Sequence, residues 1–263
     1  MKIYSYKDDQ IIENNSLIEA LEIDIQKDRV VTIVGAGGKT TTMFRLGEEI
    51  SNLNKRTIIT TTTHMALEKD FVLVEDDEDL KKIEEIFETR NLIKIGKKEG
   101  DYNIKDLDFD LLEKDICNYK IKSLDFDLLE KAISICDNVL IEGDGSKRLP
   151  LKVPRENEPV IIKNTNLVIG IIGIDCIDKK IKDICHRPKS VANFLKKSIE
   201  QNIECEDIVK IATSQTGLKK NVNCKYKVVL NKVDSKKYLE RCKKIASLCQ
   251  NFDVDIVFTS YKR

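Results

Sequence analysis

The stretch Arg29-Val30-Val31-Thr32-Ile33-Val34-Gly35-Ala36-Gly37-Gly38-Lys39-Thr40-Thr41 changes character twice within thirteen residues. Its first part is rich in β-branched residues and predicts a buried strand, which the glycines then end. After Thr41 the apolar residues recur on one helical face, at Met43, Leu46, Ile50 and Leu53. The stretch therefore predicts a strand, a glycine-rich loop and an amphipathic helix in immediate succession.

Apolar runs alternate with longer amphipathic segments along the rest of the chain, which is typical of a parallel sheet covered by helices on both faces. Further strands are predicted at Arg56–Thr60, Phe71–Val74, Asn138–Glu142, Leu167–Ile172, Tyr226–Leu230 and Val254–Phe258. Further helices are predicted at Asp77–Thr89, Ser190–Gln201, Glu206–Thr213 and Ser235–Asn251. We therefore expect a three-layer α/β fold with a mostly parallel sheet flanked by helices.

The length of 263 residues fits one such domain with insertions. The octapeptide LDFDLLEK occurs at Leu107–Lys114 and again at Leu124–Lys131. We predict a single nucleotide-binding domain over residues 1–263, with a helical insertion at about residues 100–135 that carries this repeat. A local duplication that lengthens a surface helical segment is the preferred interpretation, and a binding element is the alternative.

The charge balance argues for small-molecule or protein partners. Lysine plus arginine number 45 and aspartate plus glutamate number 45, so no overall field attracts nucleic acid or an anionic membrane. The longest apolar run, Leu167–Ile174, is too short to span a bilayer, and the N-terminal residues lack the apolar core of a signal peptide. Eight cysteines without a Cys-x-x-Cys pair indicate free thiols, and Cys242 and Cys249 are predicted to share a core face. We expect a cytoplasmic protein.

The glycine-rich loop has the residues of a phosphate-binding P-loop. Glycines let backbone amides approach phosphate oxygens, and the following helix adds its positive N-terminal dipole. Lys39 would contact the β- and γ-phosphates and the Thr40 hydroxyl would ligate Mg²⁺. The pattern departs from G-x-x-x-x-G-K-T because Ile33 replaces the first glycine. This compact form also occurs in muramyl-ligase-type ATP enzymes, and a plain strand-to-helix turn remains the alternative.

A P-loop needs acidic residues for the metal at the end of another buried strand. The segment Glu142-Gly143-Asp144-Gly145 supplies them. Glu142 or Asp144 would hold Mg²⁺, and the other would orient an attacking water. Lys147 and Arg148 follow and would add positive charge to the transferring phosphoryl group, unless they are simply solvated. With the loop, these acids predict the P-loop NTPase class.

The run Thr60-Thr61-Thr62-Thr63-His64 also ends a predicted strand, on the ligand side of a parallel sheet. Its hydroxyls could reach Mg²⁺, water or substrate, and His64 could act as an acid or base near neutral pH. The alternative is a threonine that caps a helix starting near Met65. His186, in a predicted loop, is interpreted as structural.

The segment Asn231-Lys232-Val233-Asp234 follows a late strand and resembles the guanine-recognition motif of GTPases. There a carboxylate accepts hydrogen bonds from N1–H and the 2-amino group of guanine, which adenine does not offer. The last strand ends in Thr259–Lys262, at the position of the loop that closes over guanine in those proteins. GTP is therefore favoured over ATP as the ligand. Capping of the next helix by Asn231 and Asp234 is the alternative.

Together these motifs resemble the selenium-dependent hydroxylase accessory protein family known as YqeC. The matching residues are Gly35–Thr41, Thr60–Met65, Ile141–Pro154 with Glu158–Ile161, His186–Pro188 and Leu230–Asp234. Gly143 stands where the family usually has alanine, and both acids remain. The resemblance implies a P-loop protein that serves the maturation of molybdenum hydroxylases carrying a labile selenium.

The expected function is that of an accessory protein that binds and hydrolyses GTP or ATP with Mg²⁺. Its partners would be the nucleotide and a client molybdenum hydroxylase or the proteins that mature its cofactor. The alternative is an ATP-dependent ligase or a phosphoryl or nucleotidyl transferase acting on a small molecule. A module with purely structural nucleotide and a metallochaperone are further alternatives, the latter weakened by the absence of a Cys/His cluster in the sequence.

Overall fold

The protein is described by a computed structural model that covers residues 1–68, 70–100 and 119–261. Strands form a sheet of twelve, and eight of them run parallel in the order β14-β13-β11-β3-β9-β4-β7-β6. Their bounds are β14 Asp255–Ser260, β13 Lys225–Asn231, β11 Leu167–Gly173, β3 Val30–Gly35, β9 Asn138–Glu142, β4 Thr57–Thr61, β7 Leu92–Glu99 and β6 Phe71–Leu73. The prediction of a large, mostly parallel sheet in an α/β fold is confirmed.

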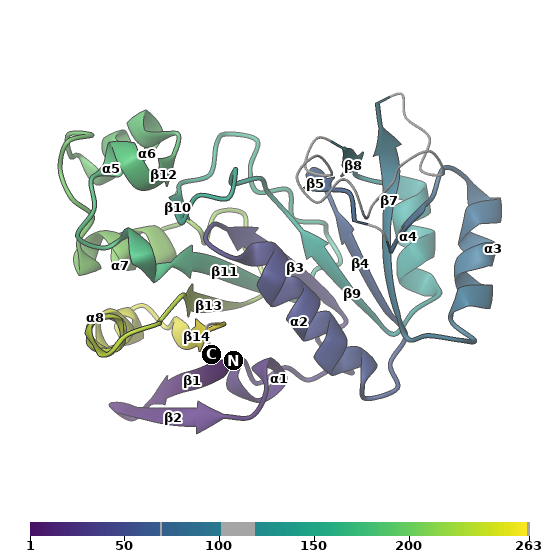
Figure 1. The fold of residues 1–263 in the computed structure, drawn as a ribbon, viewed down its shortest axis with the longest axis horizontal. Coiled ribbons are helices and arrows are strands. Elements are labelled where there is room, and N and C mark those ends of the chain that lie inside the picture. Colours follow the sequence, from purple (N-terminus) through teal and green to yellow (C-terminus); the bar gives the residue numbers. More distant parts are fainter. Residues whose placement is uncertain (69, 101–118, 262–263) are drawn as a thin grey trace, which may run out of the picture.

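Antiparallel strands extend the sheet at both ends. On the β14 side lie β1 (Lys2–Lys7) and β2 (Gln10–Asn14), which place the N-terminus beside the C-terminal strand (Figure 1). On the other side β8 (Lys120–Lys122) pairs with β7 and with β5 (His64–Ala66). A separate two-stranded sheet joins β10 (Leu151–Lys152) to β12 (Cys185–His186).

The longer helices are amphipathic and cover the sheet on both faces (Figure 1). Their bounds are α1 Leu17–Ala20, α2 Lys39–Ser51, α3 Asp77–Ile86, α4 Phe126–Ser134, α5 Ile181–Ile184, α6 Pro188–Leu195, α7 Cys205–Thr213 and α8 Lys236–Gln250, with a 3₁₀ turn at Ile174–Cys176. The predicted strands and three of the four further predicted helices agree with these bounds within a few residues, but the helix predicted at Ser190–Gln201 ends at Leu195 in the structure.

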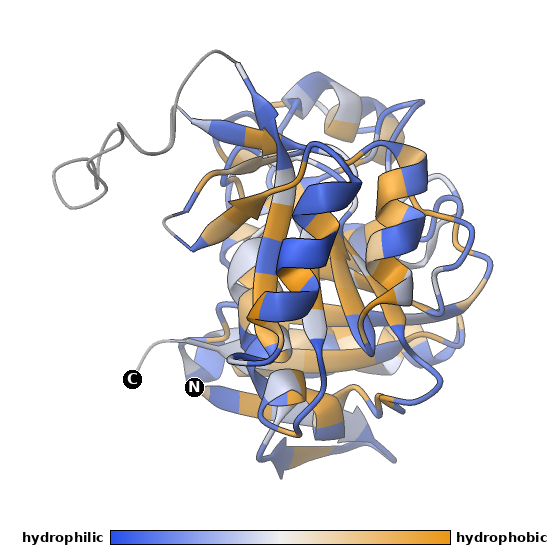
Figure 2. Cartoon of the chain, turned by 90° about the vertical axis from the view of Figure 1, so that its right-hand side faces the viewer, coloured by the Kyte–Doolittle hydropathy of each residue, from blue (hydrophilic) through white to orange (hydrophobic). Residues whose placement is uncertain are grey.

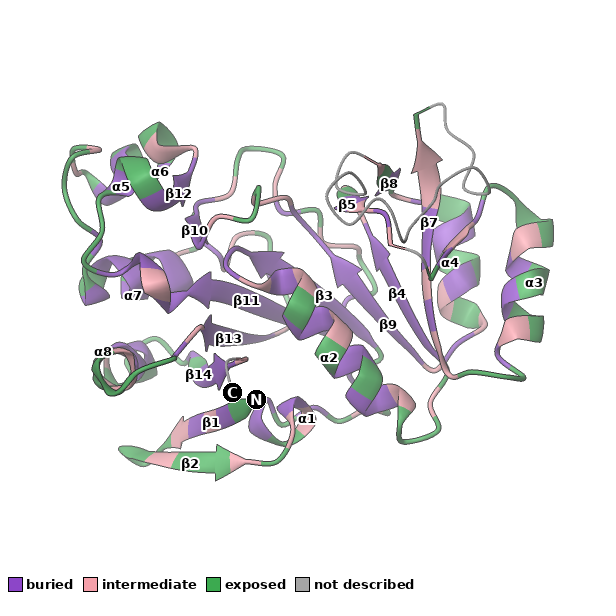
Figure 3. Ribbon diagram, in the orientation of Figure 1, coloured by how far each residue is buried: buried purple, intermediate pink, exposed green. Residues whose placement is uncertain are grey.

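Successive side chains of β3 point to opposite faces of the sheet and contribute to the hydrophobic clusters on both faces. Val31 and Ile33 pack with α1 and α2 on one face of the sheet. Val34 points to the opposite face, into the cluster that includes α7 and α8, and Val30 joins the cluster under α3 and α4. All six residues of β3 are buried, as the unbroken purple of the central strands shows (Figure 3). The continuous apolar sequence therefore reflects burial on both faces.

Seven described strands were not predicted: the two- and three-residue strands β5, β8, β10 and β12, and the longer strands β1, β2 and β7. In β2 only half-buried and exposed residues occur, and in β1 buried residues alternate with more exposed ones. Polar and charged side chains break the pattern of β7, where Lys94, Lys97 and Lys98 occur among the isoleucines. In β1, β2 and β7, one face of the strand is exposed to solvent or carries side chains that form ion pairs. Their sequences therefore lack the apolar run that identifies a central parallel strand.

The second copy of the octapeptide repeat leads into α4, whose Leu128, Leu129 and Ala132 pack under the sheet with α3. Orange apolar positions of the helices turn toward the orange strands, and blue positions turn outward (Figure 2). The first copy lies outside the described residues. The second copy was expected on a surface helical segment. It instead leads into α4, a helix that packs against the sheet and follows the strand β8.

The cysteines behave as predicted where they are described. Cys242 and Cys249 are both buried in the cluster under α8, and seven described cysteines carry free thiols. In the described part of the chain, no helix has both the length and the apolar character required to cross a membrane.

The N-terminal strand should contribute to stability because Ile3, on β1, is only 3% exposed and packs with α1 and β14. We expect Ile3→Ala to lower the free energy of unfolding by about 2–4 kcal/mol, through lost apolar contact and a cavity. Urea denaturation measures this. Ile12→Ala, on β2 at a side chain that is 44% exposed, is the control and should change it by less than about 0.5 kcal/mol. Equal effects would show that β1 is not part of the cooperative core.

Candidate functional site

The carboxyl ends of the parallel strands meet at one edge of the sheet, and the glycine-rich loop lies there between β3 and α2. Three positions of the loop, Gly35, Gly37 and Gly38, leave no room for a Cβ. Gly38 has φ +127°, and a Cβ there would lie 2.0 Å from Nδ2 of Asn231. Gly37 has φ +87°, and its Cβ would lie 2.3 Å from the backbone nitrogen of Gly173. The loop is thus packed against the ends of β13 and β11 at backbone distance.

Lys39 begins α2 and turns back under the loop. Its side chain is 2% exposed, and its Nζ donates to the carbonyl of Gly35 at 2.9 Å. The same Nζ lies 3.3 Å from Oε1 of Glu142 and 3.3 Å from Oδ1 of Asp144. Burial by itself would lower the pKa of Lys39, but the two carboxylates outweigh it and the pKa is raised. The ammonium is therefore held charged in a buried position.

Glu142 ends β9 and faces the first turn of α2. The Thr40 hydroxyl donates to its Oε2 at 3.3 Å, while Lys39 lies beside Oε1. Burial raises the pKa of Glu142, and the nearby Asp144 raises it further against the opposing effect of Lys39. The sequence prediction that Thr40, Lys39 and this acid come together is met by the structure.

Asp144 is completely buried and holds the loop in place. Its two oxygens accept from the amide of Gly35 at 3.0 and 3.1 Å. Lys39 approaches Oδ1 and Lys152 approaches Oδ2, the latter at 2.9 Å. Each carboxylate oxygen thus has an amide and an ammonium partner, which satisfies a buried charge.

A chain of alternating charges continues from Asp144 toward the surface. Lys152, fully buried on β10, also donates to Oε2 of Glu158 and to the carbonyl of Gly145, both at 2.8 Å. Arg187 meets Glu158 with two nitrogens, at 3.0 and 3.3 Å. Burial would raise the pKa of Glu158, but Arg187 and Lys152 lower it to about 2. Burial and the neighbouring cations lower the pKa of His186 to about 4.

The threonine run after β4 supports the turn that follows β9. The hydroxyl of Thr61 donates to the carbonyl of Glu142 at 3.0 Å, and that of Thr62 donates to the carbonyl of Val160 at 2.9 Å. The helix-cap alternative for these threonines is wrong, because His64–Ala66 continues as the strand β5. His64 is exposed and its Nε2 lies 3.0 Å from Oε1 of Glu99, away from Lys39 and its two carboxylate partners.

Asn231 and Asp234 occupy different positions at the ends of β13 and β14. Nδ2 of Asn231 donates to the carbonyl of Gly37 at 2.8 Å, and its Oδ1 accepts from Thr259 at 2.9 Å. Asp234 accepts from the hydroxyl of Ser260 at 2.5 Å. The helix-cap alternative is wrong for both, because Ser235 is the N-cap of α8 and accepts from the Tyr238 amide.

A pocket of about 600 Å³ opens between these motifs. Its wall includes Gly38 and Thr41 from the loop, Asn231, Lys232 and Asp234 from the end of β13, and the rings of Tyr238 and Tyr261. Nζ of Lys232 lies 3.0 Å from Asp175, which also lines the pocket. The loop and the Asn-Lys-x-Asp segment, predicted to act together, therefore share one cavity.

The sequence profile of the family described as YqeC protein matches residues 31–189, more than half of the chain. The chain belongs to the YqeC family. A relative from Escherichia coli (strain K12), named as uncharacterized protein YqeC, is 28% identical over 216 residues, which are 77% of this chain and 76% of that protein. The family match includes the loop, Glu142, Asp144 and Arg187, whereas Asn231–Asp234 lies beyond it.

Within the matched family segment, sequence reasoning missed the roles of Lys152 and Glu158. Both residues belong to motifs that carry the resemblance, but no local pattern distinguishes a buried lysine from a solvated one. The available signal was the apolar setting of Lys152 between Leu151 and Val153, which places it on a buried strand. Arg148 and Lys147 are exposed and adopt positive φ values of 61° and 49°. Their proposed contact with a phosphoryl group stays a prediction.

Removal of Glu158 should change the dependence of stability on pH. A carboxyl whose pKa falls from 4.5 to about 2 on folding stabilises the protein above pH 4.5, and that stabilisation disappears as the pH falls toward 2. We expect Glu158→Gln to lower the free energy of unfolding by about 2–3 kcal/mol near pH 7 and by much less near pH 3. Urea denaturation at several pH values measures the difference.

The exposed neighbour Glu156 provides the control for that experiment. Glu156→Gln should leave both the stability and its pH dependence close to those of the wild type. A difference between wild type and Glu158→Gln that does not shrink on acidification would contradict the assigned ion pairs.

Proposed function

We propose that the protein is a P-loop protein that binds and hydrolyses a nucleoside triphosphate with Mg²⁺, with GTP favoured over ATP. The observation that carries the proposal is the buried ammonium of Lys39, placed at the start of α2 against Glu142, Asp144 and the glycine-rich loop. A charged lysine at a helix N-terminus behind a glycine loop is suited to bind phosphate.

The proposed nucleotide lies across the loop with its base in the 600 Å³ pocket. Backbone amides of Gly35–Thr41 and the helix dipole would contact the phosphates, and Lys39 would reach the β- and γ-phosphate oxygens. The negative phosphates would then share the ammonium with Glu142 and Asp144. Gly38 and Thr41 line the base pocket, and Lys39 lies under the same loop. The base and the phosphates of one nucleotide would therefore both contact residues of this loop.

The residues around Lys39 fit a magnesium ion, since Thr40 and Glu142 offer a hydroxyl and a carboxylate oxygen within 3.3 Å of each other. Mg²⁺ usually takes one or two carboxylates, waters and phosphate oxygens, and it neutralises phosphate charge. Asp144 already has partners on both oxygens and is buried. We therefore assign Glu142 and Thr40 to the metal and Asp144 to holding the loop.

Recognition of guanine rests on Asp234. Its carboxylate borders the pocket and would accept hydrogen bonds from N1–H and the 2-amino group. Asn231 would act indirectly, because its amide already joins the loop carbonyl of Gly37 to Thr259. The rings of Tyr238 and Tyr261 offer apolar surface for the flat base.

The cellular role follows from the family resemblance. We propose a cytoplasmic accessory protein for maturation of a selenium-dependent molybdenum hydroxylase, with that client or its cofactor-maturation proteins as partner. The segment 143–149 links Glu142 to the surface, and Asp144 ties it to the loop through Gly35 and Lys39. Nucleotide turnover that changes the charge beside Lys39 would alter this segment, which is the usual way a phosphate site signals.

A second candidate is an ATP-dependent ligase or a phosphoryl or nucleotidyl transferase acting on a small molecule. A further cavity of about 960 Å³, whose wall includes Ser146, favours it. Mass spectrometry of products distinguishes the two functions, because an accessory NTPase releases only nucleoside diphosphate and phosphate.

Calorimetric titration with GTP and ATP, with and without Mg²⁺, tests the main proposal. We expect Mg²⁺-dependent binding that Thr40→Ala weakens at least tenfold and Lys39→Ala abolishes, because a metal ligand and the phosphate-binding charge are lost. Lys189→Ala, at an exposed lysine of α6, is the control and should bind as the wild type does. Circular dichroism checks the fold of Lys39→Ala, which removes the ammonium partner of Glu142 and leaves Asp144 with Lys152. Absence of binding by the wild type would exclude the function.

Base preference is tested with Asp234→Asn. An amide presents a donor toward the 2-amino group of guanine, so we expect GTP affinity to fall at least tenfold while ATP affinity changes little. The control is Asp253→Asn at an exposed residue on the loop before β14. Competition of both nucleotides against a fluorescent GTP analogue measures the two affinities. An equal loss for GTP and ATP would mean that Asp234 supports the pocket without reading the base.

A further inference from the structure

A cavity of about 960 Å³ lies on the other side of Lys39 from the base pocket. Five segments form its wall, and we call it the basic cavity. They are residues 62–64 after β4, Glu99 with the β8 residues Lys120 and Lys122 and Ser123, residues 145–147 after β9, residues 155–158, and His186 with Arg187. Its volume is at the upper end of the range for small-molecule sites, large enough for a ligand of nucleotide size.

Every residue that lines the basic cavity is polar, charged or glycine, as far as the described residues show. Its wall consists of lysine, arginine, histidine, glutamate, asparagine, serine, threonine and glycine. Pockets for drug-like or aromatic ligands are mostly lined by apolar and aromatic side chains. The base pocket contains the rings of Tyr238 and Tyr261, whereas the described wall of the basic cavity contains no Phe, Tyr, Trp or aliphatic residue. Its ligand should therefore carry polar or charged groups that meet these side chains.

The charge of the lining is positive. Lys120, Lys122, Lys147, Arg155 and Arg187 outnumber the acids Glu99, Glu156 and Glu158. Arg187 and Glu158 pair with each other, so four cationic side chains remain against two acidic ones, of which Glu99 lies 3.0 Å from His64. Clefts lined by one sign of charge attract the opposite charge from solution. An anionic ligand is therefore favoured over a cationic or neutral one.

Two connections join the basic cavity to the proposed phosphate site. Nζ of Lys39 lies 3.3 Å from the hydroxyl of Ser146, which is part of the cavity wall. Lys152 bridges Asp144, the partner of Lys39, to Glu158 in the same wall. A molecule in the cavity would thus lie next to the outer end of a bound triphosphate, while the base occupies the pocket on the opposite side.

We propose that the basic cavity is a second ligand site for a small organic phosphate, a molecule whose phosphate groups contact Lys122 and Lys147. This inference rests on the proposed nucleotide function, since it places the phosphate ligand beside the nucleotide that Lys39 would hold. The ammonium groups of the lysines and the serine and threonine hydroxyls in the wall can each donate hydrogen bonds to phosphate oxygens. If this site exists, the protein binds two small molecules, a nucleotide and a second phosphate compound.

The test uses the full chain saturated with a non-hydrolysable GTP analogue and Mg²⁺, so that the loop is filled. Inorganic pyrophosphate, the probe, is titrated by calorimetry at low ionic strength, where charge interactions are least screened. We expect saturable binding that the double variant Lys122→Glu/Lys147→Glu weakens at least tenfold. Both lysines are exposed, so the reversals should leave the fold intact. Lys122→Glu alone should also leave the binding of the GTP analogue unchanged. Because Lys147 is itself a predicted phosphoryl contact, the affinity of the double variant for the analogue is measured first and the analogue is then added to saturation.

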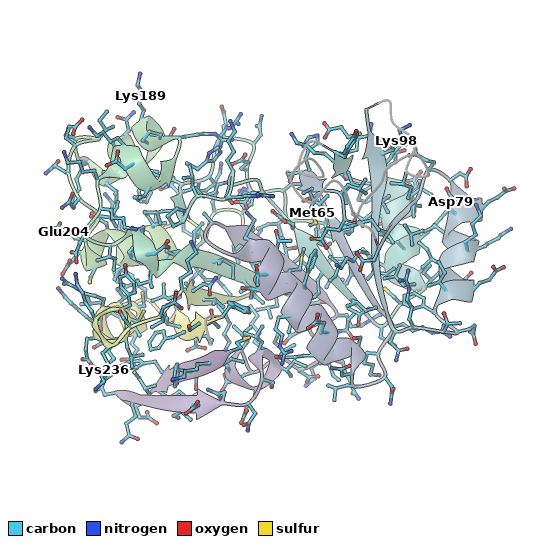
Figure 4. The ribbon with its side chains drawn as sticks, viewed as in Figure 1. Met65, Asp79, Lys98, Lys189, Glu204 and Lys236 are labelled. Carbon is cyan, nitrogen blue, oxygen red and sulfur yellow. The ribbon has the colours of Figure 1, made fainter. Side chains whose placement is uncertain are left out.

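The matched control is Lys189→Glu, because Lys189 projects outward from α6 and does not belong to the cavity wall (Figure 4). It should bind pyrophosphate as the wild type does. Citrate, titrated in parallel, separates phosphate from carboxylate recognition. Absence of pyrophosphate binding, binding unaffected by the double variant, or binding of citrate in preference to pyrophosphate would each overturn the proposal.

Failure of the nucleotide function has a different signature. If the GTP analogue does not bind, pyrophosphate is titrated into the nucleotide-free chain and into Lys39→Ala. Binding that depends on Lys122 and Lys147 but not on Lys39 would retain the basic cavity as an anion site. Binding that depends on Lys39 alone would overturn it.

Discussion

The buried ammonium of Lys39 is the charge around which the edge of the sheet is arranged. An unpaired charge in the interior is costly, and breaking a buried pair commonly costs about 3–5 kcal/mol. Lys39 therefore requires both Glu142 and Asp144 at 3.3 Å, which fixes the end of β9 against the end of β3. Asp144 in turn requires Lys152, and Lys152 requires Glu158. One charge thus determines the positions of three loops that follow different strands.

Close backbone packing adds a second constraint at the same edge. Gly37 and Gly38 leave no space for a Cβ, and the Asn231 amide fills the position beside Gly38 while it binds the carbonyl of Gly37. The side chain of Asn231 therefore fixes the end of β13 relative to the loop, because β13 and β3 are not neighbours in the sheet. Because Asp234 lies three residues further on, the same packing sets the distance between the proposed phosphate and base positions. A side chain in place of hydrogen at Gly37 or Gly38 would disturb both.

The sequence predicted strand positions best for strands whose two faces are both buried. The central strands carry unbroken apolar runs, so their positions were predicted closely, and the residues after them were correctly expected at one edge. β1, β2 and β7 were missed because each has a side open to solvent or to ion pairs, so polar and charged residues interrupt the apolar run that identifies a central strand. Lys39 and Glu142 were expected together from their types, whereas Lys152 and Glu158 were not. A buried ion pair depends on distant residues that meet only after folding, and local spacing does not encode it.

The two cavities differ in a way that follows from their neighbours. On the β13 and β14 side, strands end in Tyr261 and in the residues that meet α8, so the pocket has rings and little free charge. On the β9 and β4 side, the sheet continues into short strands whose lysines face the opening. The loop and Lys39 lie between them: Asn231, in the wall of the base pocket, donates to the loop carbonyl of Gly37, and Ser146, in the wall of the basic cavity, accepts from Lys39. If a ligand shifted Lys39, the electrostatic field in both cavities would change, so the proposed nucleotide site and the proposed phosphate site would be coupled through this residue.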